Sequence, residues 1–151
     1  MDAIETQEPW FHEGLRFKCT GCGQCCTGTP GYVFLSEPDM ERLAAHFSLS
    51  IQAFARKYTR LVEGQYALLE KSFGDCIFLE NNRCMIYEAR PIQCQTFPWW
   101  IHNLRDPEDW NEASKKCEGI NHPDAPIVSS LEIQQQCLTY LDSLLAQNFT
   151  L

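Results

Sequence analysis

Cys19-Thr20-Gly21-Cys22-Gly23-Gln24-Cys25-Cys26 is the stretch that decides how this chain folds, because it places four thiols within eight residues. Thiolates are the ligands that soft and borderline metals prefer. An apolar core does not require four cysteines in one loop that also contains glycine. Gly21 and Gly23 would let backbone N–H groups approach the sulfur atoms and stabilise their negative charge. The stretch therefore predicts a metal site.

Five further cysteines extend this prediction to the rest of the chain. We expect all but the last of them to bind metal, so that the predicted ligands are Cys19, Cys22, Cys25, Cys26, Cys76, Cys84, Cys94 and Cys117. Cys137 lies on the apolar stripe of an expected helix, and an unligated cysteine is often a small buried apolar residue. We therefore expect Cys137 to belong to the core.

The spacing of the first cysteines bears on the kind of metal. Cys19, Cys22 and Cys25 follow one another at three-residue intervals, as do three ligands of many iron–sulfur clusters. Zinc sites more often combine one C-x-x-C pair with a second, distant pair. The adjacent Cys26 is expected to serve a second centre or another ion of one polynuclear centre. We favour an iron–sulfur cluster over Zn²⁺, with zinc left open.

Composition and charge restrict the classes of protein to consider. The chain has 151 residues, which predicts one domain spanning residues 1–151. Its net charge of −8 argues against nucleic acid as a partner, because phosphate binding requires basic surfaces. No apolar run is long enough for a membrane span, and the acidic first residues do not resemble an export signal. We expect a cytoplasmic protein without disulfides, since that compartment keeps thiols reduced.

Apolar periodicity and capping residues predict an α+β fold that is rich in helix, with a β-hairpin and an irregular cysteine-rich centre stapled by metal. The expected elements are helices over 37–47 and 50–59, a strand over 65–72, a hairpin of 76–80 with 83–86, a short helix that carries Cys94, a helix over 109–116 and a last helix over about 130–147. Residues 101–109 are expected to form a loop or a short strand. The hairpin would bring Cys76 and Cys84 to face each other.

The last helix is expected to begin with a capping box of Ser129 and Glu132. Its apolar residues recur at helical spacing, which indicates a face packed on the rest of the domain. The predicted inner face consists of Leu131, Gln134, Cys137, Leu138, Leu141, Leu144 and Leu145.

Three separated blocks resemble the YkgJ-like cysteine-cluster family, whose domains are described as zinc- or iron-chelating. They are Cys19-x-x-Cys22-x-x-Cys25-Cys26, Cys76-Ile77-Phe78-Leu79, and Arg83-Cys84-x-Ile86-Tyr87-x-x-Arg90-Pro91-x-x-Cys94-x-x-Phe97-Pro98. The resemblance extends from about residue 17 to about residue 118. It implies a metal-binding role for the eight cysteines up to Cys117 and supplies no reaction.

Three functions remain open from the sequence, and no catalytic residue can be named. The first is an iron–sulfur protein with a redox or cofactor-supporting enzymatic role. The second is a zinc-stabilised module that binds a protein partner without catalysis. The third is an enzyme whose metal keeps an open coordination position, which predicts a cleft beside Arg90, Cys94 and Trp99. The oligomeric state stays open.

Overall fold

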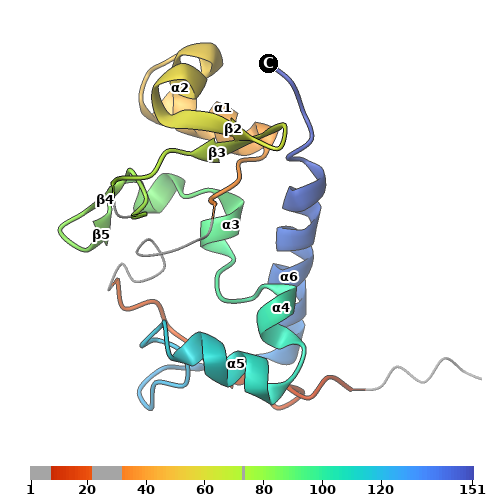
Figure 1. The fold of residues 1–151 in the computed structure, drawn as a ribbon. Coiled ribbons are helices and arrows are strands. Elements are labelled where there is room, and N and C mark those ends of the chain that lie inside the picture. The colour runs from red at the N-terminus through yellow and green to blue at the C-terminus, as the bar shows by residue number, and fades with distance from the viewer. Residues whose placement is uncertain (1–7, 22–31, 73) are drawn as a thin grey trace, which may run out of the picture.

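Two groups of short elements lie along the C-terminal helix α6 (Ser130–Leu145) in the computed structural model, which describes residues 8–21, 32–72 and 74–151 (Figure 1). Helices alternate with two-stranded antiparallel sheets, in agreement with the predicted α+β class. Cys22, Cys25 and Cys26 lie outside the described residues. Among the described helices, none has both the length and the apolar character that crossing a membrane demands.

The first group contains α1 (Glu37–His46), α2 (Ile51–Tyr58), β2 (Thr59–Val62) and β3 (Gln65–Leu68). Ser36 begins α1 with a capping box, in which its hydroxyl accepts from the Asp39 N–H and its own N–H donates to the Asp39 carboxylate. Such caps satisfy N–H groups that have no partner inside the helix. The predicted helices agree to within a residue or two. The core of this group is made of Leu35, Met40, Leu43, Ala44, Phe54, Leu68, Phe78, Ile86 and Ala89.

The hairpin of β4 (Leu79–Glu80) and β5 (Arg83–Cys84) is shorter than expected. Asn81 and Asn82 form its two-residue turn, each with a positive φ that asparagine tolerates. This turn fixes the register, so that Cys84 lies opposite Leu79, while Cys76 bridges Glu70 instead. Cys76 and Cys84 are therefore not cross-strand partners in this hairpin, and the expected proximity of their thiols stays a prediction.

The middle of the chain continues through the 3-10 helix η2 (Tyr87–Ala89), α3 (Ile92–Gln95), α4 (Ile101–Leu104) and α5 (Pro107–Ser114). Cys94 lies on a short helix, as predicted. The expectation of a loop or strand over 101–109 is wrong, because α4 and the start of α5 occupy it. Asp106 caps α5 by accepting from the Asp109 N–H at 2.8 Å, and Pro107 takes the first helical position.

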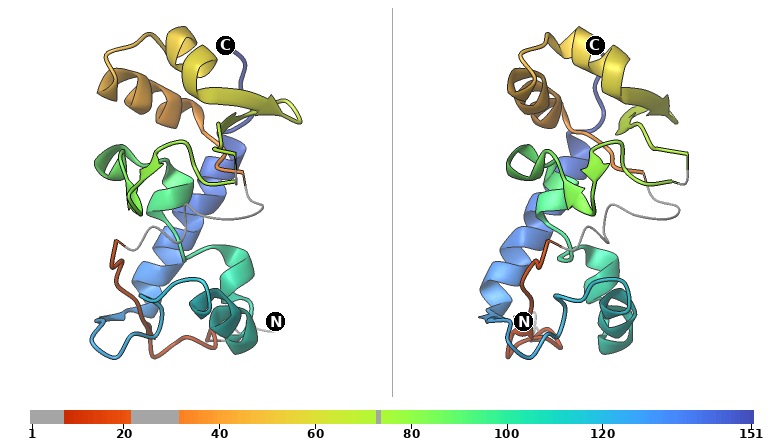
Figure 2. Two further views of the ribbon diagram at one scale, coloured as in Figure 1. Left: turned by 60° about the vertical axis from the view of Figure 1, so that its left-hand side comes forward. Right: turned by 90° about the vertical axis from the view of Figure 1, so that its left-hand side faces the viewer.

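The second group is closed by β1 (Leu15–Arg16), which pairs with β6 (Ile127–Val128). Its core consists of Phe11, Trp99, Leu104, Trp110, Ile120 and Ile133. The Trp99 and Trp110 rings stack with their centroids 5.3 Å apart. The views in Figure 2 show α6 running from this group to the first one. There the Glu37 N–H donates to the carbonyl of Ala146, just after α6, at 3.2 Å.

The predicted inner face of α6 is largely wrong. Leu131, Leu138 and Leu145 are 67%, 60% and 76% exposed. The buried line instead starts at Ile133 and passes Cys137, Tyr140 and Leu144 to Gln147 just after the helix, while Ser143 is buried beside it. The predicted face was chosen by its leucines, but tertiary packing leaves that face exposed to solvent. Leucines are an uncertain guide to the buried face, because apolar residues are common on protein surfaces as well as inside. The N-cap at Ser129 is confirmed by the hydrogen bond that it accepts from the Glu132 N–H.

Candidate metal centre

The described cysteines are distributed over both groups of elements. Cys76 and Cys84 are half-buried against the first core, and Cys117 is half-buried against the second. Cys94 is half-buried on α3, while Cys19 is exposed. Within residues 8–21, 32–72 and 74–151, no three or more His, Cys, Asp or Glu side chains are grouped to hold a metal ion. The predicted convergence of eight thiols stays a prediction, because three of them lie outside these residues.

The segment that carries Cys19 is attached to the segment that carries Cys117. The Lys18 N–H donates to the Gly119 carbonyl at 3.2 Å, and the bridge between Phe17 and Ile120 continues this antiparallel contact. Each of these two cysteines is therefore within two residues of a backbone contact between the segments.

Gly119 permits this contact because it has no side chain. A Cβ at position 119 would lie 2.0 Å from the Lys18 carbonyl oxygen. Real atoms do not approach so closely, so any other residue would force the two segments apart. A second link joins the Thr20 hydroxyl to the Glu118 carboxylate, to which it donates at 2.5 Å.

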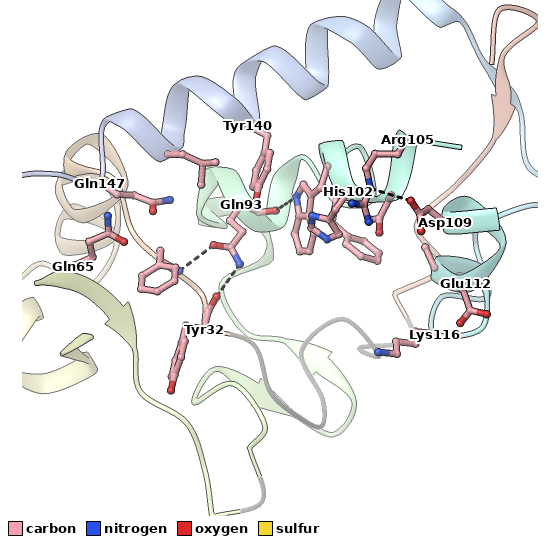
Figure 3. A pocket seen from close by; sticks show the side chains of 16 residues that line it. Tyr32, Gln65, Gln93, His102, Arg105, Asp109, Glu112, Lys116, Tyr140 and Gln147 are labelled. Carbon is pink, nitrogen blue, oxygen red and sulfur yellow. Dashed lines mark hydrogen bonds and ion pairs between the residues drawn. The ribbon is translucent and has the colours of Figure 1, made fainter. Parts of the chain in front are cut away.

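The other side of the cysteine-rich stretch is attached to the helix that carries Cys94. The Gln93 amide donates to the Tyr32 carbonyl at 2.9 Å and accepts from the Phe34 N–H at 3.0 Å (Figure 3). Residues 22–31 are thus flanked by one attachment beside Cys94 and another beside Cys117. The sequence did not reveal this role of Gln93, whose partners are about 60 residues away along the chain.

Asp39 connects α3 to the first core. Its side chain is 1% exposed, and its Oδ1 accepts from the Ile92 N–H at 3.0 Å and from Arg42 Nη2 at 2.7 Å. The same guanidinium nitrogen donates to the Arg90 carbonyl at 2.7 Å. One buried carboxylate therefore holds both the start of α1 and the start of α3, because its Oδ2 accepts from the Ser36 N–H.

The cleft expected beside Arg90, Cys94 and Trp99 stays a prediction, because residues 22–31 lie outside the described part of the chain. The Arg90 guanidinium stacks 3.9 Å from the centre of the Tyr87 ring, and Trp99 is buried in the second core. A cavity of about 760 Å³ has Gln93 and Lys116 in its wall, the residues directly before Cys94 and Cys117.

The remaining cysteine and the histidines do not extend the ligand set. Cys137 packs against the second core, and its burial raises the pKa of the thiol, which fits the expected role in the core. His122 Nδ1 accepts from the Asp124 N–H at 3.1 Å. The His46 ring packs edge-on against Phe47. Neither histidine belongs to a group of ligands within the described parts of the chain.

These features describe a cysteine-rich α+β domain. The chain belongs to the family "CxxCxxCC: Putative zinc- or iron-chelating domain", whose model matches residues 18–118. It is also 27% identical over 93 residues to "Uncharacterized protein MJ0661" of Methanocaldococcus jannaschii, a match that covers 60% of this chain and 49% of the relative. The chain thus matches about half the length of that relative. No solved structure matches.

Proposed function

We propose that this protein holds a polynuclear iron centre, and specifically an iron–sulfur cluster, with a redox or cofactor-supporting role. The thiolates that would hold it are those of Cys19, Cys22, Cys25, Cys26, Cys76, Cys84, Cys94 and Cys117. The main support for the proposal is that both sides of residues 22–31 are hydrogen-bonded to segments that carry other cysteines. Lys18, on one side, contacts Gly119 near Cys117, and Tyr32, on the other side, contacts Gln93 next to Cys94. The zinc- or iron-chelating family that the chain belongs to supports it further.

The donor set fits such a group by its chemistry. Thiolates bind both iron–sulfur clusters and zinc, and cysteines at three-residue spacing are typical of the former. Because the described residues alone hold no group of three ligands, the proposal requires Cys22, Cys25 and Cys26 to complete the site. When bound, a cluster of this kind would supply electron transfer.

The described residues would position several of the ligands. Gly119 keeps the segments of Cys19 and Cys117 together, and Gln93 holds the residues after the cysteine-rich stretch against α3. Asp39 fixes the start of α3 through the Ile92 N–H. Burial and hydrogen bonds around a cluster set its reduction potential. We further propose a cytoplasmic location, because thiolate ligands require a reducing compartment.

Zinc is the alternative that the family description favours equally. A zinc-stabilised module would use the same thiolates to hold the fold and would have no chemistry of its own. The exposed leucines of α6 would suit a protein partner of such a module. The two metal-bound forms would differ in colour, because an iron–sulfur protein absorbs visible light and a zinc protein does not.

Anaerobic purification followed by metal analysis and visible spectroscopy tests the proposal. We expect a brown protein whose absorption bleaches on reduction, and we expect Cys94→Ser to lose most of its iron. Cys137→Ser is the matched control and should keep the iron content of the unmodified protein, because Cys137 packs in the core.

Two results would contradict the proposal. Colourless protein with stoichiometric zinc after strictly anaerobic purification would exclude the iron centre and leave the zinc module. Equal iron content in Cys94→Ser and the unmodified protein would exclude Cys94 as a ligand.

A further inference from the structure

The outward face of α6 carries a stripe of exposed leucines. Leu131, Leu138 and Leu145 follow one another at intervals of seven residues, and each of them is mostly exposed. A seven-residue repeat drifts only about 20° around a helix axis, so the three side chains lie along one line. The other elements lie mainly to one side of α6 in Figure 1, and no described element covers the stripe. It is therefore open to contact with another molecule.

The surface around this stripe carries little charge. Of the 16 residues of α6 only Glu132 and Asp142 are charged, and the helix contains neither lysine nor arginine. The exposed amides of Gln134 and Gln135 flank the leucines instead. A helix face that remains in water is normally charged or polar, whereas an apolar centre depleted of charge is typical of protein–protein interfaces. The stripe therefore indicates that α6 packs against a protein surface.

The stripe is complementary to itself. Leu138 lies at its centre, with Leu131 seven residues before it and Leu145 seven residues after it. A two-fold axis that passes beside Leu138 brings this residue against its counterpart in a second copy, and it brings each Leu131 against the Leu145 of the other copy. Leucines at seven-residue intervals pack in this way where two helices form a seam. The occupant that fits the whole stripe is therefore a second copy of this chain, with its helix antiparallel.

The charges beside the stripe favour the antiparallel arrangement. It places the exposed carboxylate of Asp142 opposite Gln134 and Gln135 of the second copy, whose amide N–H groups can donate to it. A parallel pair would instead set each Asp142 beside the Asp142 of the other copy, and each Glu132 beside the other Glu132, and like charges repel. The dipoles of two antiparallel helices also oppose each other favourably. Charge and hydrogen bonding therefore agree with a two-fold axis at Leu138.

The size of the stripe determines how strong the contact can be. A helix of 16 residues is about 24 Å long and about 10 Å wide, so the seam covers about 240 Å² on each copy. A standard stable interface buries about 800 Å² per partner. We propose that two copies of this chain form a reversible antiparallel dimer through α6, with the two-fold axis at Leu138 and a dissociation constant of about 10 μM to about 1 mM. The dimer does not depend on which metal the cysteines hold.

Analytical ultracentrifugation of the full chain, purified anaerobically and kept under reducing conditions, tests the proposal without interference from disulfides between copies. Over a range of about 5 μM to about 1 mM, we expect the average mass to rise from close to 17.4 kDa toward twice that value. A chain that stays near 17.4 kDa throughout would overturn the proposal and leave the stripe to a different protein. Assemblies larger than a dimer would also overturn it, because a two-fold contact closes on itself.

Leu138→Glu tests whether the axis lies where we place it. The change sets two carboxylates against each other at the centre of the seam, and it should weaken dimer formation at least about tenfold. Leu61→Glu is the matched control, because Leu61 on β2 has the same exposure of 60% and lies in the first group of elements. The control should form the dimer like the unmodified chain, and circular dichroism melts at about 5 μM check that both variants fold. Equal effects of the two changes on dimer formation would overturn the role of α6.

A pair of changes at the two ends of the stripe tests the antiparallel orientation. Leu131→Glu and Leu145→Lys should each weaken dimer formation when studied alone, because each sets a charge against a leucine at both ends of the seam. In an equal mixture, an antiparallel pair brings the two changed residues together at one end and leaves two leucines at the other. The mixture should therefore form dimers at least about tenfold more tightly than either variant alone. No gain on mixing would overturn the antiparallel arrangement.

Discussion

Gly119→Ala tests how closely the two cysteine-carrying segments must approach. The added methyl group would lie 2.0 Å from the Lys18 carbonyl oxygen and 3.0 Å from its carbonyl carbon. Ordinary contact requires about 3.5 Å, so the backbones must separate by about 1.5 Å. The hydrogen bond from the Lys18 N–H to the Gly119 carbonyl, now 3.2 Å, would then exceed hydrogen-bonding distance. Overpacking costs about 1–3 kcal/mol and the lost hydrogen bond about 1 kcal/mol, so we expect the free energy of unfolding to fall by about 2–4 kcal/mol.

The assay combines urea denaturation with metal analysis of the anaerobically purified variant. Besides the lower stability, we expect a reduced metal content, because separation of the segments moves Cys19 away from Cys117. Gly64→Ala is the matched control. Its φ of +83° makes alanine unfavourable, but no atom lies within 4 Å of the added methyl group, and the turn between β2 and β3 is remote from both segments. The control should lose stability and keep its metal. Unchanged stability and metal content in Gly119→Ala would show that neither the fold nor the metal site depends on this close approach.

Three further predictions concern the buried carboxylate, the metal and pH. Asp39→Asn removes the charge that holds Arg42 and the Ile92 N–H. Urea denaturation should show a free energy of unfolding lowered by about 2–3 kcal/mol. An unchanged denaturation midpoint would contradict this. Chelation should lower the melting temperature seen by circular dichroism strongly, because thiolate sites contribute on the order of 10 kcal/mol to folding; identical melts would exclude a stapling metal. Burial and the Arg105 charge lower the pKa of His102 below 6.5. The unfolded chain therefore takes up this proton first, so stability should fall slightly as pH drops below 6.5, and His102→Gln should remove that dependence. A histidine pKa at or above 6.5 by NMR titration would contradict it.

The sequence predicted those parts of the fold that rest on neighbouring residues. The helices expected over 37–47 and 50–59 and the N-cap expected at Ser129 are confirmed, because a cap involves residues only three positions apart. The two-residue turn at 81–82 was also recognisable from its asparagines. The register that this turn imposes pairs Cys84 with Leu79, and Cys76 lies outside the two paired strands.

The remaining errors and omissions come from long-range packing. The outer face of α6 is rich in leucine, and only the position of both cores determines that Ile133 and Gln147 are turned inward instead. The cysteines of the candidate site could be chosen by residue type and spacing. The residues that attach their segments, Gln93, Gly119 and Asp39, contact partners more than 50 residues away, and no local pattern distinguishes them.

X-ray absorption spectroscopy at the metal edge of anaerobically purified protein would show directly whether the thiolates of this chain surround iron. We expect iron with a first shell of sulfur at about 2.3 Å, the usual metal–thiolate distance, together with a second iron atom close by. We also expect Cys94→Ser to lose this signal and Cys137→Ser to keep it. A first shell of oxygen and nitrogen, or the absence of any bound metal, would contradict the claim that the cysteines of this chain converge on a metal centre.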